Sequence, residues 1–109
     1  MIKDRGKVVN HFGYWPEFAD GKFTRFSYEN IGLIEASIIY IDSNTSKVAR
    51  IALKFNGVTD IQLSELKSEN VIDEMSFIGE SPTTVVIKAC YGLNGSFMCT
   101  EIEVCSVHT

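Results

Sequence analysis

The chain has 109 residues, and its ten basic and fourteen acidic side chains give a net charge of −4 at pH 7. This balance argues against nucleic-acid binding, which needs clustered Lys and Arg to neutralise phosphates, and equally against an anionic membrane surface. Hydrophobic residues make up 45% and charged residues 22%, which excludes a disordered chain. We therefore expect one globular domain over residues 1–109, with no nucleic-acid or membrane partner.

The cysteines and the N-terminus favour a cytoplasmic protein. The N-terminal residues lack the apolar stretch of a signal peptide, and the longest apolar run, residues 36–41, is too short to span a bilayer. Cys90, Cys99 and Cys105 lie in apparent strands without CxxC or His-paired spacing. We expect three buried, reduced thiols, as is usual in the cytoplasm.

The chain begins with a predicted short helix over residues 4–11, which Gly13 is well placed to end. Alternation of apolar and polar residues then predicts strands over 22–28, 33–41, 47–55, 58–63, 71–78, 83–91 and 96–107. In the third of these, the inward residues are Ala49, Ile51, Leu53 and Phe55. The polar residues 42–46 predict a hairpin loop.

Asn56-Gly57 is a strong turn dipeptide, and as a two-residue hairpin it would fold residues 58–63 back onto 47–55. The predicted fold class is α+β, mainly β. We expect an antiparallel sheet of about six or seven short strands, or a small sandwich, with one short N-terminal helix.

The residues from Phe12 to Gly21 stand out because they include the only Trp of the chain and four aromatic side chains within seven positions. Aromatic side chains bury the largest apolar areas, so this stretch is typical of a hydrophobic plug that closes one end of a sheet. The same aromatics could instead form a binding surface.

No metal, phosphate or nucleophile motif occurs in the sequence, so no catalytic residue, metal ligand or cofactor is predicted. Glu101 and Glu103 alternate on one strand face, together with Phe97, Cys99 and Cys105, and form either a solvated face or an acid pair. His11 and His108 lie near opposite ends of the chain. A nucleophile pair of Cys90 with His108 has no support from spacing.

The strongest charge signal lies between Asp60 and Glu80, where six acids against one base, Lys67, give a local charge of −5. Such a surface suits docking onto a cationic partner, although it could also be a solvated face that aids solubility. The predicted partner-binding residues are Asp60, Glu65, Glu69, Asp73, Glu74 and Glu80.

Three short motifs resemble one known family. They are Phe12-Gly13-Tyr14-Trp15-Pro16-Glu17-Phe18-Ala19-Asp20, then Phe55-Asn56-Gly57-Val58-Thr59-Asp60, then Asn70-Val71-Ile72. In order and spacing they resemble bacterial immunity proteins of polymorphic toxin systems, in particular the group called immunity protein fifty. The motif residues expected to be structural are Phe12, Gly13, Trp15, Pro16, Phe18 and Asp20. Ala19 departs from the family pattern, which has His at this position.

The resemblance implies a non-catalytic immunity protein that binds and neutralises a cognate bacterial toxin domain, which we expect to be basic. An alternative is a structural or accessory module that forms a homodimer through a strand edge, for which the apolar strand 33–41 is the candidate. A third hypothesis, a small hydrolase or ligand-binding barrel, requires a pocket that holds Glu101, Glu103 or His11.

Overall fold

The computed structural model describes residues 2–109 and is mainly β, with one short helix. Its elements are β1 (Ile2–Lys3), α1 (Gly6–Phe12), β2 (Lys22–Glu29), β3 (Leu33–Ile41), β4 (Val48–Asn56), β5 (Thr59–Ser64), β6 (Val71–Ile78), β7 (Thr83–Tyr91), β8 (Asn94–Cys99) and β9 (Glu101–His108).

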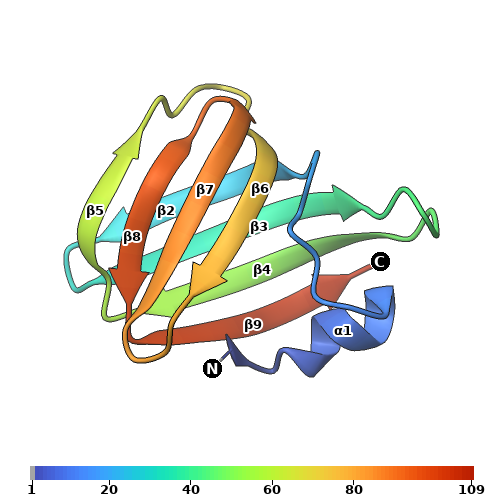
Figure 1. The fold of residues 1–109 in the computed structure, drawn as a ribbon, viewed down its shortest axis with the longest axis horizontal. Helices are drawn as coiled ribbons and strands as arrows, with labels where there is room; N and C mark the ends of the chain where they lie inside the picture. Colours follow the sequence, from blue (N-terminus) through green and yellow to red (C-terminus); the bar gives the residue numbers. More distant parts are fainter. Residues whose placement is uncertain (1) are drawn as a thin grey trace.

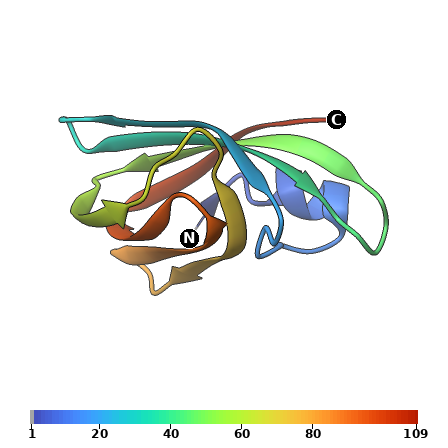
Figure 2. The same cartoon turned by 90° about the horizontal axis from the view of Figure 1, so that it is seen from above.

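The strands form one sheet that folds over on itself into two layers. Their order is β1-β9-β4-β3-β2-β6-β7-β8-β5, and β2 and β6 are paired only at Lys22 and Val71. Strands β6, β7, β8 and β5 form the short layer, which crosses in front of the long layer of β1, β9, β4, β3 and β2 (Figure 1). Figure 2 shows α1 and the segment after it beside the short layer, covering the rest of the same face of the long layer.

The expected number of strands and their wholly antiparallel pairing are wrong. Within residues 2–109 there are nine strands, and the sheet is mixed because β1 runs parallel to β9. The predicted strand 96–107 is divided at Thr100. Phe97 and Cys99 face inward before that residue, and Ile102 and Val104 face inward after it, so the inward positions change from odd to even numbers. At Thr100 the chain leaves the short layer and enters the long one.

The hairpin predicted at Asn56-Gly57 is also wrong, because β5 pairs with β8 and not with β4. Here the chain passes from the long layer to the short one. Gly57 has φ +64°, and a Cβ on it would clash with Thr100 Oγ1. The N–H of Thr100 donates to the carbonyl of Asn56 over 3.0 Å. Both crossings between the layers therefore occur at one corner, which needs a residue without a side chain.

The local predictions for β3, β4, β6 and β7 are confirmed within one residue at each end. The inward residues of β4 are buried as expected, and β4 pairs with β3 across the predicted loop. In that loop the buried Asp42 accepts hydrogen bonds from the N–H of Asn44 and the hydroxyl of Thr45. A polar side chain that caps its own turn in this way explains why the hairpin could be predicted.

The place of β3 in the sheet corrects one proposal about its role. It lies between β2 and β4 and so has no free edge. The prediction that this strand supplies the edge for a homodimer is wrong, because both rows of its backbone groups are already hydrogen-bonded within the sheet. Self-association through another edge stays a prediction.

The aromatic stretch forms the plug that its composition suggested. Phe12 and Phe18 are buried and each contacts the ring of Tyr40, with centroids 5.2 and 5.4 Å apart. Trp15 is half-buried against Phe18 and Phe77. The segment that carries these rings lies beside the short layer, on the same face of the long layer (Figure 2). Tyr14 is largely exposed and forms a hydrogen bond of 3.0 Å with the hydroxyl of Tyr40.

Candidate functional site

Two rows of side chains on the outward surface of the short layer carry no charge. On β7, Val85 and Ile87 point into the core, so Thr84 and Val86 point outward. The register extends these two positions into two rows across the sheet. The rows are Ser76, Val86, Ser96 and Gln62, and Ile78, Thr84, Met98 and Thr59. We call this surface the short-layer face.

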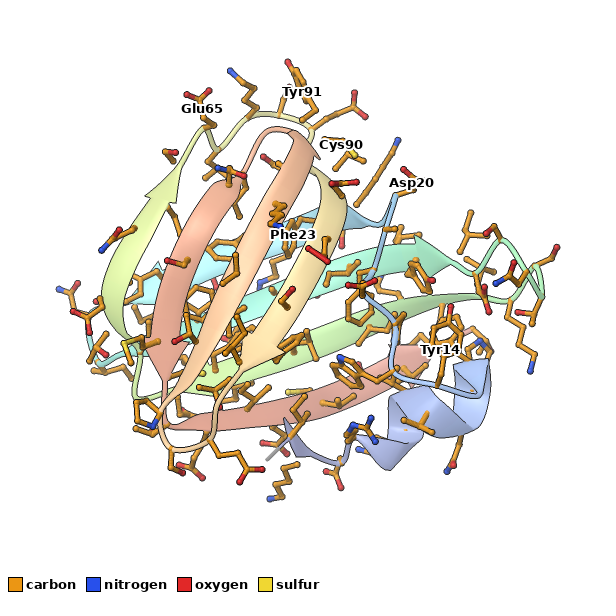
Figure 3. The ribbon with its side chains drawn as sticks, viewed as in Figure 1. Tyr14, Asp20, Phe23, Glu65, Cys90 and Tyr91 are labelled. Atoms are coloured by element: carbon orange, nitrogen blue, oxygen red, sulfur yellow. The ribbon has the colours of Figure 1, made fainter. Side chains whose placement is uncertain are left out.

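Four of the six predicted acidic residues lie around this face. Asp60 is at the start of the outer strand β5, and Glu65 directly follows that strand. Glu74 is on β6 beyond the row of Ser76, and Glu80 lies in the turn between β6 and β7. Figure 3 shows Glu65 at the upper end of the short layer. These carboxylates border two rows without charged side chains, and Lys88, the next outward residue of β7 after Val86, lies opposite Glu74.

The other two predicted acids lie in the loop before β6 and in β6 itself. Glu69 is in the loop between β5 and β6, and its carboxylate lies 3.4 Å from Lys22 Nζ. Asp73 is exposed at a bulge in β6, near Cys90 and Asp20, which are labelled beside the upper end of β6 in Figure 3. That all six acids contribute to one partner-binding surface stays a prediction, with Glu69 and Asp73 set apart from the other four by the loop and the β6 bulge.

Three lysines form ion pairs with acids of this stretch and partly neutralise it. Lys67 lies 3.6 Å from Glu65, while Lys88 of β7 lies 3.3 Å from Glu74. Lys67 is already counted in the local excess of five acids, so Lys22 and Lys88 reduce this excess to three. The sequence count overlooked Lys22 and Lys88, which strand pairing brings in. These ion pairs are exposed, so each contributes little and is screened by salt.

Glu17 is a site residue that the charge count missed. A hydrogen bond with Glu74 raises the pKa of Glu17, and the same bond lowers the pKa of Glu74, with Lys88 lowering it further. The carbonyl of Glu17 accepts a hydrogen bond of 2.9 Å from the N–H of Met75. This contact between the plug and β6 is distant in sequence, and the only local signal for it was the motif around Trp15.

Two of the three cysteines are not buried as predicted. Cys99 is buried, and burial raises its pKa to about 11, whereas Cys90 and Cys105 are exposed at strand positions that face outward. Desolvation, followed by Asp73 and Asp20, raises the pKa of Cys90. A thiol with a raised pKa is a poor nucleophile, which leaves a pair with His108 without chemical support.

The groups required for a hydrolase or ligand-binding pocket are dispersed. Glu101 and Glu103 do not share a face with Phe97 and Cys99 as predicted, because the strand is divided at Thr100. The Nε2 of His11 lies 3.2 Å from the carbonyl of Val48. A hollow beside His11 is lined by Lys7, Asn10, Val107 and Thr109, and neither glutamate borders it. Of the three residues named in the third hypothesis, only His11 therefore lines this hollow, and the hypothesis stays a prediction.

Residues 2–109 contain neither a metal-binding cluster nor a membrane-spanning helix. No group of three or more His, Cys, Asp or Glu side chains is arranged to hold a metal ion. No helix in this part of the chain is long and apolar enough to cross a membrane.

Several residues of the first motif lie in the scaffold. Phe12, Pro16 and Phe18 are buried, and Gly13 ends α1 in the left-handed conformation, with its N–H donating to the carbonyl of Val9 over 2.7 Å. The N–H of Asp20 donates to the carbonyl of Ile72 over 2.7 Å. Ala19, where the family pattern has His, is exposed. This departure changes the surface and leaves the plug intact.

Comparison with known proteins adds no relative. No protein-family model matches the chain, and no curated protein or solved structure is significantly similar to it.

Proposed function

We propose that this protein is a non-catalytic, cytoplasmic immunity protein that binds and neutralises a cognate bacterial toxin domain. The observation that carries the proposal is the short-layer face, with its uncharged centre and its rim of acids. Protein–protein interfaces are depleted of charge at the centre and polar at the rim. The resemblance of the motifs around Trp15 and Gly57 to immunity proteins indicates the kind of partner.

The chemistry of the face defines the partner's surface. Val86, Met98 and Ile78 supply apolar area at the centre, and the small side chains of Ser76 and Ser96 leave the surface flat enough for close approach. A complementary surface has an apolar projection surrounded by Lys and Arg. The acids of the rim mainly speed the encounter, whereas the buried central contacts determine how long the complex lasts.

The proposal is tested with the toxin domain encoded beside the gene of this protein, by measuring association and dissociation rates. A lysine in the centre, Val86→Lys, should weaken binding by at least about 100-fold, because an unpaired charge is buried in the interface. Glu65→Gln should slow association by about twofold to fivefold in low salt, and this effect should disappear in high salt.

The matched control places the same charge on the other side of the molecule. Ala52 lies on β4 between the inward Ile51 and Leu53, so Ala52→Lys adds a lysine to the outward face of the long layer. This variant should bind as the wild type does. The proposal fails if no complex forms in low salt, or if Ala52→Lys is as damaging as Val86→Lys.

The alternative, a structural or accessory module that forms a homodimer, has one observation in its favour. Strand β5 is the last strand of the sheet, so one row of its backbone groups is not paired within the sheet, and its Ile61 is 40% exposed. A strictly monomeric mass at high protein concentration would remove this alternative.

A further inference from the structure

The short layer has a second open edge, on β6. The first part of this edge is covered by the plug, where Ile72 exchanges hydrogen bonds with Asp20 and Gly21 and the N–H of Met75 donates to Glu17. Beyond Met75, no strand within residues 2–109 pairs with β6 on that side. The edge is thus open over its last residues.

The register shows which backbone groups this opening leaves unpaired. Successive residues of a strand direct their N–H and C=O groups to opposite sides. Since Met75 uses its N–H toward Glu17, Ser76 and Ile78 face β7, and Phe77 faces the open edge. The N–H and C=O of Phe77 therefore point to a side where the described residues offer them no partner.

This open edge borders a groove. Two adjoining hollows of about 370 and 230 Å³ share Ile2, Arg5 and Phe77 in their walls. The larger is also lined by Trp15, and their combined length follows β6 from Met75 to Gly79. The groove thus runs along the unpaired backbone of β6, with Ile2, Arg5 and the plug on its other side.

The groove holds hydrogen-bond donors that lack acceptors. The guanidinium of Arg5 lies over the ring of Trp15, 5.8 Å from its centroid, and forms no ion pair with any described residue. The indole N–H of Trp15 is buried without a hydrogen-bond partner. Glu17 and Glu80 lie at the two ends of the groove, and Glu17 is hydrogen-bonded to Glu74. The middle of the groove therefore favours an occupant rich in acceptors.

We propose that this groove binds an extended peptide segment of a partner protein, which adds as a strand to the open edge of β6 and places an acidic side chain against Arg5. An added strand satisfies the N–H and C=O of Phe77, as in other cases of strand addition to a sheet edge. The aromatic wall of Trp15 and Phe77 supplies the apolar contact. This site is separate from the short-layer face and does not depend on the proposed toxin.

The test follows backbone and indole N–H signals by NMR during titration with a blocked peptide, acetyl-Thr-Val-Glu-Val-Thr-amide. We expect saturable shifts, at peptide concentrations up to about 2 mM, for Phe77, Arg5 and the indole of Trp15. The matched peptide with Lys in place of Glu should bind about tenfold more weakly, because it loses the charged hydrogen bond to Arg5. Arg5→Gln should abolish this difference between the two peptides.

Two internal controls keep the proposal falsifiable. In the free protein, the amide of Phe77 should exchange with solvent much faster than those of Ser76 and Ile78, and the peptide should slow its exchange. Strand β5, whose edge is also open, reports non-specific strand addition. The proposal is overturned if Phe77 is already protected, if no shift appears, if β5 responds equally, or if the Lys peptide binds as tightly.

Discussion

At the scale of single residues, the corner made by Gly57 and Thr100 is a place where the fold tolerates little change. Gly57→Ala combines a left-handed backbone with a clash against Thr100, whose Oγ1, Cβ and Cγ2 all lie close to the added carbon. We expect a loss of about 2–4 kcal/mol in the free energy of unfolding, measured by urea denaturation. Adding Thr100→Ala should recover about 1 kcal/mol, because two of the three crowding atoms are removed.

Gly13 provides a matched control for the backbone contribution. It also has a positive φ, +89°, but nothing lies within 4 Å of the carbon that Gly13→Ala would add. This substitution should cost only about 1 kcal/mol. Equal losses at the two positions would show that the corner is not crowded and would contradict the steric explanation.

At the scale of elements, the hydrogen bond between Glu17 and Glu74 joins the plug to β6 and makes this contact sensitive to pH. The raised pKa of Glu17 means that the folded state holds this proton more tightly than the unfolded chain. Its favourable contribution is therefore complete at low pH and is lost as the pH rises through the raised value. Glu74 has a lowered pKa, so its contribution is present at neutral pH and is lost on acidification.

Glu17→Gln isolates the first of these effects. The amide donates to Glu74 at every pH and carries no charge, so the variant should be more stable than the wild type at neutral pH. Below the ordinary glutamate pKa of about 4.3, wild-type Glu17 is itself protonated and the difference should vanish. Urea midpoints measured across this range, with the exposed Glu101→Gln as control, check the expectation. A difference that does not change with pH would contradict it.

Elements that are stabilised by neighbours in sequence were predictable, and their assembly was not. The β3–β4 hairpin followed from alternation and from a loop whose Asp42 caps its own turn. Asn56-Gly57 has the sequence of a hairpin turn, yet Gly57 serves a crossing whose reason, Thr100, lies far along the chain. A periodic pattern reveals which residues face inward but not which layer a strand joins. The division at Thr100 was missed for that reason.

In the candidate site, too, the local features were predictable and their assembly was not. The acids between Asp60 and Glu80 were visible as a local excess of charge, and four of them do surround one face. The uncharged centre was not visible, because it takes residues from four strands and exists only once their register is set. Strand pairing likewise brought Lys88 to Glu74.

At the scale of the whole molecule, Phe55 joins the two layers. It lies on β4 of the long layer, is fully buried, and contacts Phe97 and Phe77 of the short layer with ring centroids 5.1 and 6.5 Å apart. Phe55→Ala leaves a cavity between the layers and should lower the free energy of unfolding by about 3–5 kcal/mol. Ile31 is 80% exposed, so Ile31→Ala should change it by less than about 0.5 kcal/mol.

The manner of unfolding tests whether residues 1–109 form the predicted single domain. The fluorescence of Trp15 reports on the plug, and far-ultraviolet circular dichroism reports on the strands of both layers. Because one core cluster contains residues of α1, the plug and both layers, the two signals should change at the same urea concentration in the wild type and in Phe55→Ala. Separate transitions would show that the layers unfold independently, and Phe55 would then stabilise only one of them.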